Sequence, residues 1–350
     1  MNDVQNRILS VALFFITFLG VCWLLRPGYT EDATLRAKVE YFRQHKDEFD
    51  FLFLGSSRIY RCFNSKEFDQ HLAAAGIKNR SYNIAFQYHR PHEMNVLLRE
   101  ILASKPKRLK FVAVELMDWN PTILSAMRSH DRTPAWHTPR ETWAACWTIA
   151  AAKEPLEKKI QWWTIHLSNL VARSINHGGG SRWLRQRFSA KSDEREHQRL
   201  LKKMERGDGF VALDDETEEV YAMRYNRFRE QFWEIFWEQV QVIPDKNQQA
   251  GTLDHFNLAA QLDQQKVIQE AGAGALFVIP TVRQGTPVMN QLSRHVDHFM
   301  SYNHPLKWPH LYRRNRYWDR RHMNRRGASE FTKVFADNFI QWHRTHRKGV

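Results

Sequence analysis

Cysteine is scarce in this sequence, and its three residues form no recognisable framework. Cys22 lies in an apolar N-terminal segment, so Cys62 and Cys146 are the only two that could pair. Two cysteines permit a disulfide in an oxidising compartment but do not imply one. No CxxC spacing of the kind that zinc sites use occurs. The pairing of Cys62 and Cys146 stays open.

Glycine and proline are also few, and acidic residues are a minority. Only 15 Gly and 12 Pro occur among 350 residues, whereas 43% of the chain is hydrophobic, which excludes a collagen-like or low-complexity protein. The 38 acidic residues are outnumbered by 52 basic ones, giving a formal charge of +14. We expect a packed globule whose surface attracts anions, which charge alone does not separate into nucleic acid, anionic lipid or acidic polymer.

Charge is absent from residues 8–25, a stretch long enough for a slightly short transmembrane helix. The segment ends in Cys-Trp-Leu-Leu-Arg-Pro and lacks the small residues of a signal-peptidase site, so we predict an uncleaved anchor with a short cytoplasmic end at 1–7. The alternatives are a removed signal peptide and the buried helix of a soluble protein. A signal-anchor places the C-terminal domain outside the cytoplasm.

Strand and helix patterns alternate after the anchor. We predict a helical linker over 30–49, followed by strands at 51–54, 81–85, 109–116 and 275–282. Helices between them imply an α/β fold with a parallel, doubly wound sheet. The two halves of this core are expected at 50–119 and 251–350, separated by a largely helical insertion over 120–250.

The insertion is rich in Trp and basic residues. It contains a glycine break at Gly178–Gly180 and one long predicted helix over 220–242. That helix carries an aromatic stripe, which is more typical of core or lid packing than of a ligand platform. Some of the Trp residues could instead border a sugar site, since aromatic faces suit carbohydrate rings.

Three residues suggest a serine nucleophile. Ser57 follows the predicted strand 51–54 through a small-residue turn, and Asp319 and His322 lie three residues apart before the last predicted helix. A hydroxyl needs a base to remove its proton, and an imidazole needs a carboxylate to fix its tautomer. The competing interpretation is that Ser56 and Ser57 cap a helix and that Asp319 and His322 are a surface pair.

The motifs resemble those of the SGNH (GDSL-type) hydrolase superfamily. The resemblance rests on Gly55-Ser-Ser57, on Asn83-Ile-Ala85, and on the ending Asp-x-x-His-x-Asn-x-x-Gly-Ala-x-x-Phe-Thr at 319–332. It covers about 50–116 and 275–343. Within this superfamily the chain resembles membrane-anchored proteins of bacterial polysaccharide O-acetylation and teichoic-acid D-alanylation, which act with membrane-bound O-acyltransferases. The resemblance implies a three-layer α/β/α, flavodoxin-like core in the bacterial inner membrane, with no cofactor.

The resemblance also implies roles for single residues. Ser57 matches the nucleophile, His322 the general base and Asp319 its orienting partner, while Ser56 falls where many members have Asp. The Ser57 N–H and Asn83 are the expected oxyanion donors. Ala85 stands where the second block usually has Gly, and the Gly-x-Asn-Asp block is absent, with Asn120 as a candidate substitute.

The positions of residues next to the predicted strands, and the spacing of the histidines, predict which residues lie near the pocket and whether a metal site is present. Ser56 and Arg58 flank the serine turn, and His89 and Arg90 follow the second strand, so we expect all four near the pocket. The pairs His89/His92 and His295/His298 lack the helical i, i+4 spacing with a third ligand, so we predict no metal site. The G-x-S-x-G motif of α/β-hydrolases does not occur.

These observations predict an exported serine acyl esterase or O-acyltransferase. Its substrate would be an acylated polysaccharide or another surface polymer, and its partner a membrane-bound O-acyltransferase. The basic run Arg313–Arg326 brackets the Asp–His pair, and an exported protein is not expected to bind nucleic acid. The alternative is a non-catalytic accessory protein that keeps the fold to bind polymer or to support the acyltransferase.

Overall fold

The computed structural model describes residues 3–24, 32–119, 123, 132–176, 190–249, 251, 255–282 and 284–346. The chain divides into two compact units. One comprises Met1–Ala37 and Asn120–Leu200, and the other comprises Lys38–Trp119 and Leu201–Val350. Residues 201–249, which we expected in the insertion, therefore belong to the unit that contains the sheet. Asn120 and Gly178–Gly180 lie outside the described residues.

A parallel sheet forms the centre of the second unit, as the alternating pattern predicted. Its strand order is β2-β1-β3-β4-β5. Because β2 and β3 lie on opposite sides of β1, the sheet has a switch point between β1 and β3, where ligands of open α/β sheets bind beyond the strand ends. The strands are β1 Phe51–Leu54, β2 Ser81–Asn83, β3 Phe111–Glu115, β4 Gly274–Ile279 and β5 Phe299–Ser301.

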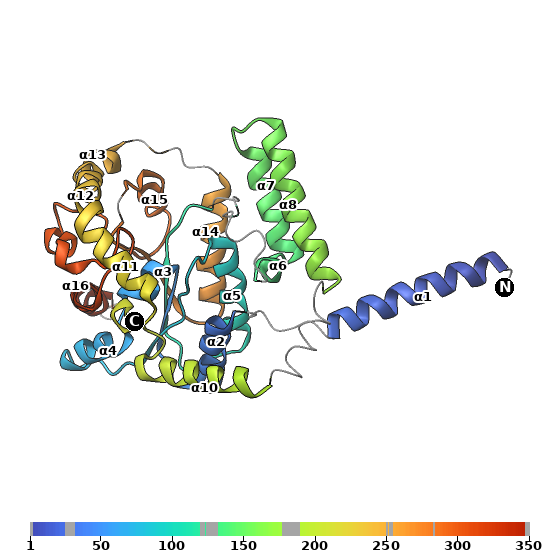
Figure 1. The fold of residues 1–350 in the computed structure, drawn as a ribbon, viewed down its shortest axis with the longest axis horizontal. Coiled ribbons are helices and arrows are strands. Elements are labelled where there is room, and N and C mark those ends of the chain that lie inside the picture. Colours follow the sequence, from blue (N-terminus) through green and yellow to red (C-terminus); the bar gives the residue numbers. More distant parts are fainter. Residues whose placement is uncertain are drawn as a thin grey trace. The chain divides into compact units, whose positions relative to one another are not determined.

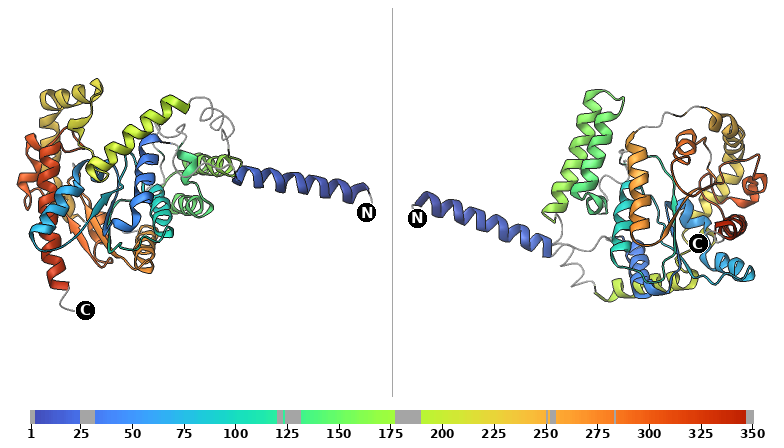
Figure 2. Two further views of the ribbon diagram at one scale, coloured as in Figure 1. Left: turned by 90° about the horizontal axis from the view of Figure 1, so that it is seen from below. Right: turned by 180° about the vertical axis from the view of Figure 1, so that it is seen from behind.

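Helices cover both faces of this sheet, with α5 and α14 on one side and α4 and α16 on the other (Figure 2). Near-continuous apolar strands such as Phe51–Leu54 require this double cover. The helices of this unit are α3 Ser57–Cys62, α4 Ser65–Ala74, α5 Pro91–Ala103, α11 Glu219–Arg227, α12 Trp233–Gln241, α13 Ile243–Gln248, α14 His255–Glu270, α15 Pro287–Leu292 and α16 Arg325–His346. Short 3-10 turns occur at Lys46–Glu48, Leu213–Asp215, Pro309–Tyr312 and Arg314–Arg316.

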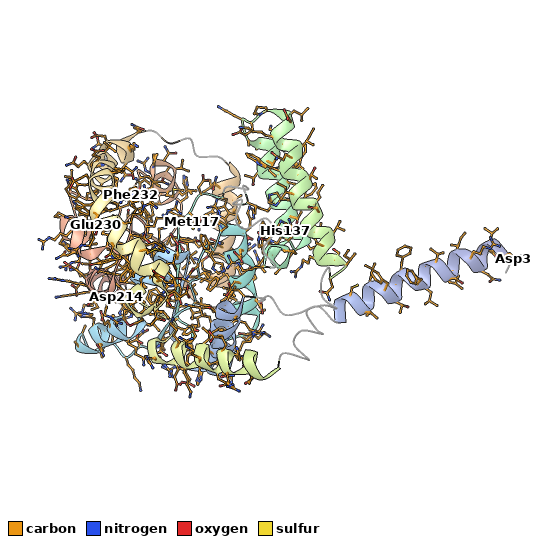
Figure 3. All side chains as sticks on the ribbon, in the orientation of Figure 1. Asp3, Met117, His137, Asp214, Glu230 and Phe232 are labelled. Atoms are coloured by element: carbon orange, nitrogen blue, oxygen red, sulfur yellow. The ribbon has the colours of Figure 1, made fainter. Side chains whose placement is uncertain are left out.

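Two predicted elements differ from the structure. Strand β5 was not expected, because three residues at a sheet edge give no apolar run to detect. The predicted continuous helix over 220–242 is interrupted by a π-helical turn at Phe228–Phe232, between α11 and α12. A π-turn inserts an extra residue into the helical ladder and is frequent at functional sites. Figure 3 labels two residues of this turn, Glu230 and Phe232.

Phenylalanine packing joins the two segments that carry the predicted nucleophile and base. Phe51 of β1 meets Phe339 of α16 with ring centroids 5.3 Å apart, and Phe63 after α3 meets Phe335 at 4.5 Å. All four rings are buried. Each buried Phe contributes about 1.5–3 kcal/mol. The helix that follows His322 is thereby fixed on the strand that precedes Ser57.

The other unit contains an apolar N-terminal helix, α1, over Asp3–Leu24 (Figure 1). Among the described residues it is the one helix long and apolar enough to cross a membrane, over Asp3–Cys22. The predicted span 8–25 falls within it except for residue 25, which is not described. This unit also holds α6 Thr133–Trp136, α7 Pro139–Ala151 and α8 Leu156–Ser174, while α2 Ala33–His45 and α10 Ala190–Gly207 cross the division between the units.

The three cysteines are free thiols. Cys22 and Cys62 are buried, and Cys146 is half-buried. Burial raises the pKa of the Cys62 thiol well above its ordinary value, which disfavours the reactive thiolate. The disulfide that the sequence left open between Cys62 and Cys146 is not formed in this structure.

Candidate active site

Ser57 is the first residue of α3, and the sharp turn before it depends on Gly55. A Cβ at position 55 would lie 2.5 Å from Cγ1 of Ile59 and 2.8 Å from Oε2 of Glu115, so only glycine fits. Ser56 caps the helix, with its hydroxyl accepting from the Arg58 N–H at 3.3 Å. The turn therefore delivers Ser57 to the carboxyl end of β1, beside the switch point of the sheet.

A buried carboxylate holds this turn from behind. Glu115 ends β3, and its Oε2 accepts from the Ser56 N–H at 2.6 Å. Its Oε1 lies 2.6 Å from Nη2 of Arg58. The Glu115 side chain is fully buried, so the Arg58 guanidinium supplies the opposite charge that a buried carboxylate requires. Ser56 and Arg58 thus fix the position of Ser57 from both sides.

Ser57, His322 and Asp319 form a continuous chain of hydrogen bonds. Nε2 of His322 lies 2.9 Å from Oγ of Ser57. Its Nδ1 lies 2.9 Å and 3.0 Å from the two carboxylate oxygens of Asp319. An ionised carboxylate only accepts hydrogen bonds, so the ring nitrogen that faces Asp319, Nδ1, is the one that carries the hydrogen. Nε2 then has a free lone pair and can accept the serine proton. The structure brings together the three residues that the sequence predicted to converge.

The loop that presents Asp319 and His322 is closed on itself. Trp318 N–H donates to the His322 carbonyl at 2.9 Å, and Tyr317 forms an isolated antiparallel bridge with Met323. Asn324 then caps α16, because its Oδ1 accepts from the Gly327 N–H at 2.9 Å. A Cβ on Gly327 would lie 2.1 Å from the Arg316 carbonyl oxygen. The Asp-x-x-His-x-Asn-x-x-Gly spacing is thus a loop and a helix cap that fix the orientation of His322.

Asp319 is ionised and heavily hydrogen-bonded. Its Oδ1 accepts from the Arg321 N–H at 2.8 Å and from the His322 N–H at 3.1 Å. The guanidinium of Arg224 on α11 binds Oδ2. Burial raises the pKa of a carboxyl, but His322 and Arg224 outweigh that effect and hold the pKa of Asp319 well below its ordinary value. Asp319 therefore keeps its charge at neutral pH and can stabilise a protonated His322.

The chain of hydrogen bonds opens into a cavity of about 340 Å³. Ser57 and His322 lie in its wall, so the hydroxyl can meet a ligand. Aromatic side chains and arginines make up most of the remaining wall. The full lining is Ser57, Arg61, Gln87, Tyr88, Leu213, Tyr221, Arg224, Arg227, Phe228, Phe232, Asp319, Arg320, Arg321 and His322.

None of the four predicted pocket residues, Ser56, Arg58, His89 and Arg90, lines the cavity. Nδ1 of His89 lies 3.3 Å from the Gly55 carbonyl oxygen, and burial lowers the pKa of Arg90. From this segment the cavity is lined by Gln87 and Tyr88 instead. Tyr88 is 54% exposed and has a φ of 58°, a left-handed backbone that is strained for a bulky side chain. Among the described residues no group of three His, Cys, Asp or Glu could hold a metal ion.

Asn83, the predicted side-chain oxyanion donor, is occupied elsewhere. Its side chain is buried, and Nδ2 donates to the carbonyls of Ile59 at 3.1 Å and Phe63 at 2.8 Å, while Oδ1 accepts from the Ala85 N–H. Its carbonyl oxygen accepts from Nζ of the buried Lys38 side chain at 2.6 Å. Asn83 therefore joins β2 to the end of α3, and both of its amide hydrogens are used for that purpose.

Sequence reasoning missed Arg224 and Glu115. Arg224 comes from a segment that we assigned to the insertion, and no local pattern marks it as a partner of Asp319. Glu115 left a signal, since it is the one charged residue in the apolar run 111–116 of a strand covered on both faces. A lone carboxylate at the end of such a strand indicates a buried polar contact near a site.

No protein-family model matches this sequence, and no curated protein matches it.

Proposed function

We propose that this chain is a membrane-anchored serine acyl esterase or O-acyltransferase, exported from the cytoplasm, that acts on ester groups of a cell-surface or extracellular polysaccharide. The observation that carries the proposal is the Ser57–His322–Asp319 hydrogen-bond chain at the wall of a cavity. A capping serine would need no histidine at 2.9 Å from its hydroxyl, and a surface pair would not be buried against an arginine.

The chemistry follows from the geometry. Oγ of Ser57 attacks the ester carbonyl carbon while Nε2 of His322 takes the hydroxyl proton. The tetrahedral intermediate collapses, His322 returns that proton to the leaving alkoxide, and an acyl-Ser57 ester remains. Water or a sugar hydroxyl then attacks the acyl group while His322 accepts its proton, and His322 returns that proton to Oγ of Ser57 as the acyl–serine bond breaks. Hydrolysis and transfer share the first half of this sequence.

The Ser57 N–H is the proposed oxyanion donor. It belongs to the first turn of α3, where backbone N–H groups have no partner within the helix. No hydrogen bond from this N–H occurs among those of the described residues. The neighbouring N–H groups of Ser56 and Arg58 are already used by Glu115 and by the Ser56 hydroxyl.

The fold and the anchor agree with the SGNH-type resemblance. The sheet order with Ser57 after β1 and His322 before α16 fits a three-layer, flavodoxin-like core of that superfamily. The apolar helix α1 fits a single-pass anchor in the bacterial inner membrane, with the catalytic unit outside the cytoplasm. A membrane-bound O-acyltransferase is the partner that such members have.

Two adjacent serines provide a matched test. In full-length protein in detergent, the Ser57→Ala change should abolish hydrolysis of p-nitrophenyl acetate, whereas Ser56→Ala should retain most of it. Loss of the Ser56 cap lowers stability by about 1 kcal/mol without removing the nucleophile. Equal rates for wild type and Ser57→Ala would contradict the proposal.

A second function is favoured by one observation, the use of the Asn83 amide in the fold. An accessory protein that binds polymer or supports an O-acyltransferase has no need of a second oxyanion donor. Polysaccharide binding that survives Ser57→Ala, without ester turnover by wild type in the presence or absence of a membrane acyltransferase, would support this function over the first.

A further inference from the structure

The wall of the cavity beside Ser57 is unusually basic. Five arginines line it, and Asp319 is its one acidic side chain among the described residues. That carboxylate already binds His322 and Arg224. Arg61, in turn, is neutralised by Glu216, with Nη1 of the arginine 2.7 Å from Oε1 of the glutamate. Two of the five arginines therefore have carboxylate partners within the protein.

The remaining three arginines, Arg227, Arg320 and Arg321, have no carboxylate partner among the described residues. Arg227 and Arg320 both lie over the ring of Phe232, with the guanidinium carbon 4.9 Å and 4.5 Å from the ring centroid. Such cation–π contact orients a guanidinium without neutralising its charge. The π-turn that contains Phe232 thus places one ring against two arginines in the cavity wall.

The same loop shows what a structural arginine looks like. Arg316 binds Glu330, and Arg325 binds Asp215, both through close ion pairs. Arg320 and Arg321 lie between these two in the sequence and pair with no acid in the described part of the chain. Arg320 and Arg321 thus differ from Arg316 and Arg325 in lining the cavity without an acidic partner among the described residues.

We propose that Arg227, Arg320 and Arg321 bind an oxyanion group of the acylated substrate, a carboxylate, sulfate or phosphate, close to the ester that Ser57 attacks. This inference rests on the proposed function and specifies its substrate as an acidic polymer. A guanidinium presents paired N–H donors that match the oxygens of these groups. The exposed ring of Tyr88 on the same wall offers a face for the attached sugar.

The first test compares two matched esters on the full-length protein in detergent. These are acetylated methyl glucuronoside, which carries a carboxylate, and acetylated methyl glucoside, which does not. Wild type should show a kcat/KM ratio of about ten or more in favour of the acidic ester, since one charge-assisted hydrogen bond contributes about 1.5–3 kcal/mol. The ratio should approach one in the Arg320→Gln and Arg321→Gln variants.

Arg326→Gln is the control, because Arg326 is exposed on α16, does not line the cavity, and loses the same charge. It should keep the wild-type ratio. An equal fall in the ratio for Arg326→Gln would assign the preference to overall charge and overturn the proposal. A wild-type ratio near one would overturn it for a carboxylate group.

The second test measures binding alone, so that it stands even if no ester is turned over. Ser57→Ala protein is titrated at physiological salt with oligoglucuronate, a sulfated oligosaccharide, a glycerol-phosphate oligomer and neutral oligoglucose. We expect at least one acidic oligomer to bind about tenfold more tightly than oligoglucose, and Arg321→Gln to remove that difference. The oligomer preferred identifies the anion. Equal affinity for all four would overturn this inference without touching the nucleophile, whereas absence of a reactive Ser57 would overturn only the proposed function.

Discussion

Two buried carboxylates support the Ser57–His322 contact, one on the serine side and one on the histidine side, and their roles differ. Glu115 supports the serine through the Ser56 N–H and Arg58, whereas Asp319 supports the histidine through Nδ1 and Arg224. Glu115 meets a backbone N–H and a permanent cation, so its interactions are the same before and during the reaction. Asp319 meets a ring that gains a proton as the serine attacks, so its interaction strengthens in the transition state.

The role of a carboxylate near a nucleophile is therefore set by the groups that it contacts. Loss of the Glu115 carboxylate should both displace the serine turn and lower the free energy of unfolding. Loss of the Asp319 charge should remove transition-state stabilisation and leave the fold largely intact.

The largest effect is expected for Asp319→Asn. The change keeps the side-chain volume but presents the wrong hydrogen-bonding group to Nδ1 of His322, and it should lower kcat for p-nitrophenyl acetate by about 10³–10⁴. Far-ultraviolet circular dichroism should match wild type. A variant within about tenfold of wild type would show that Asp319 has only a structural role.

Glu115→Gln should be next, with kcat lowered by about tenfold to a hundredfold because the serine turn shifts. Loss of the buried ion pair should also lower the free energy of unfolding by about 1–3 kcal/mol. Asp50→Asn is the matched control, since Asp50 is buried just before β1, at the opposite end of the strand from Ser57, and binds Arg108 at 2.7 Å and Lys110 at 2.9 Å. It should reduce stability in urea unfolding but not kcat. Comparable losses of kcat in both variants would show that Glu115 has no specific role in positioning the serine turn.

Arg224→Gln should have a smaller kinetic effect, about threefold to tenfold, because Asp319 keeps its two backbone N–H donors and His322. Arg229→Gln controls for charge on the same helical segment, since its guanidinium donates to Tyr225 at 2.6 Å and not to Asp319. Steady-state kcat values of the two variants should therefore differ, with the loss confined to Arg224→Gln. If Arg229→Gln loses as much as Arg224→Gln, the Arg224–Asp319 contact does not support catalysis.

The smallest effect concerns acid stability. The pKa of Asp319 is held below its ordinary value of 3.8, so its charge stabilises the fold above that value. The contribution is lost as the pH falls from there toward the lower pKa of the folded state. Urea unfolding should show a stability difference between wild type and Asp319→Asn at about pH 7 that shrinks below about pH 3. A difference that stays constant over this range would contradict the lowered pKa.

Much of the site could be predicted from sequence because it is local. Gly55-Ser56-Ser57 after an apolar strand and the Asp319–His322 spacing each encode a turn or loop within a few residues. The parallel orientation of β1, β2 and β3 follows from alternating strands and helices. Short-range steric and capping rules predict these turns, whereas the pairing of Ser57 with His322 was expected from the chemistry of a serine nucleophile and from the resemblance of the motifs.

The rest depends on contacts between distant segments. Arg224 reaches Asp319 from 95 positions away, and the π-turn at Phe228–Phe232 leaves no mark in the helical pattern. Asn83 was expected to face the site, but the carbonyls at the end of α3 use its amide instead. Strand β5 was missed because three residues at a sheet edge carry too little hydrophobic signal.

The most direct test of the account is labelling of the full-length protein with a fluorophosphonate, with the adduct mapped by mass spectrometry. The account predicts modification of Ser57 in wild type, none at Ser56, and loss of labelling in His322→Ala. Failure to label Ser57 in a protein with normal circular dichroism, or labelling that persists without His322, would contradict an activated serine at this site.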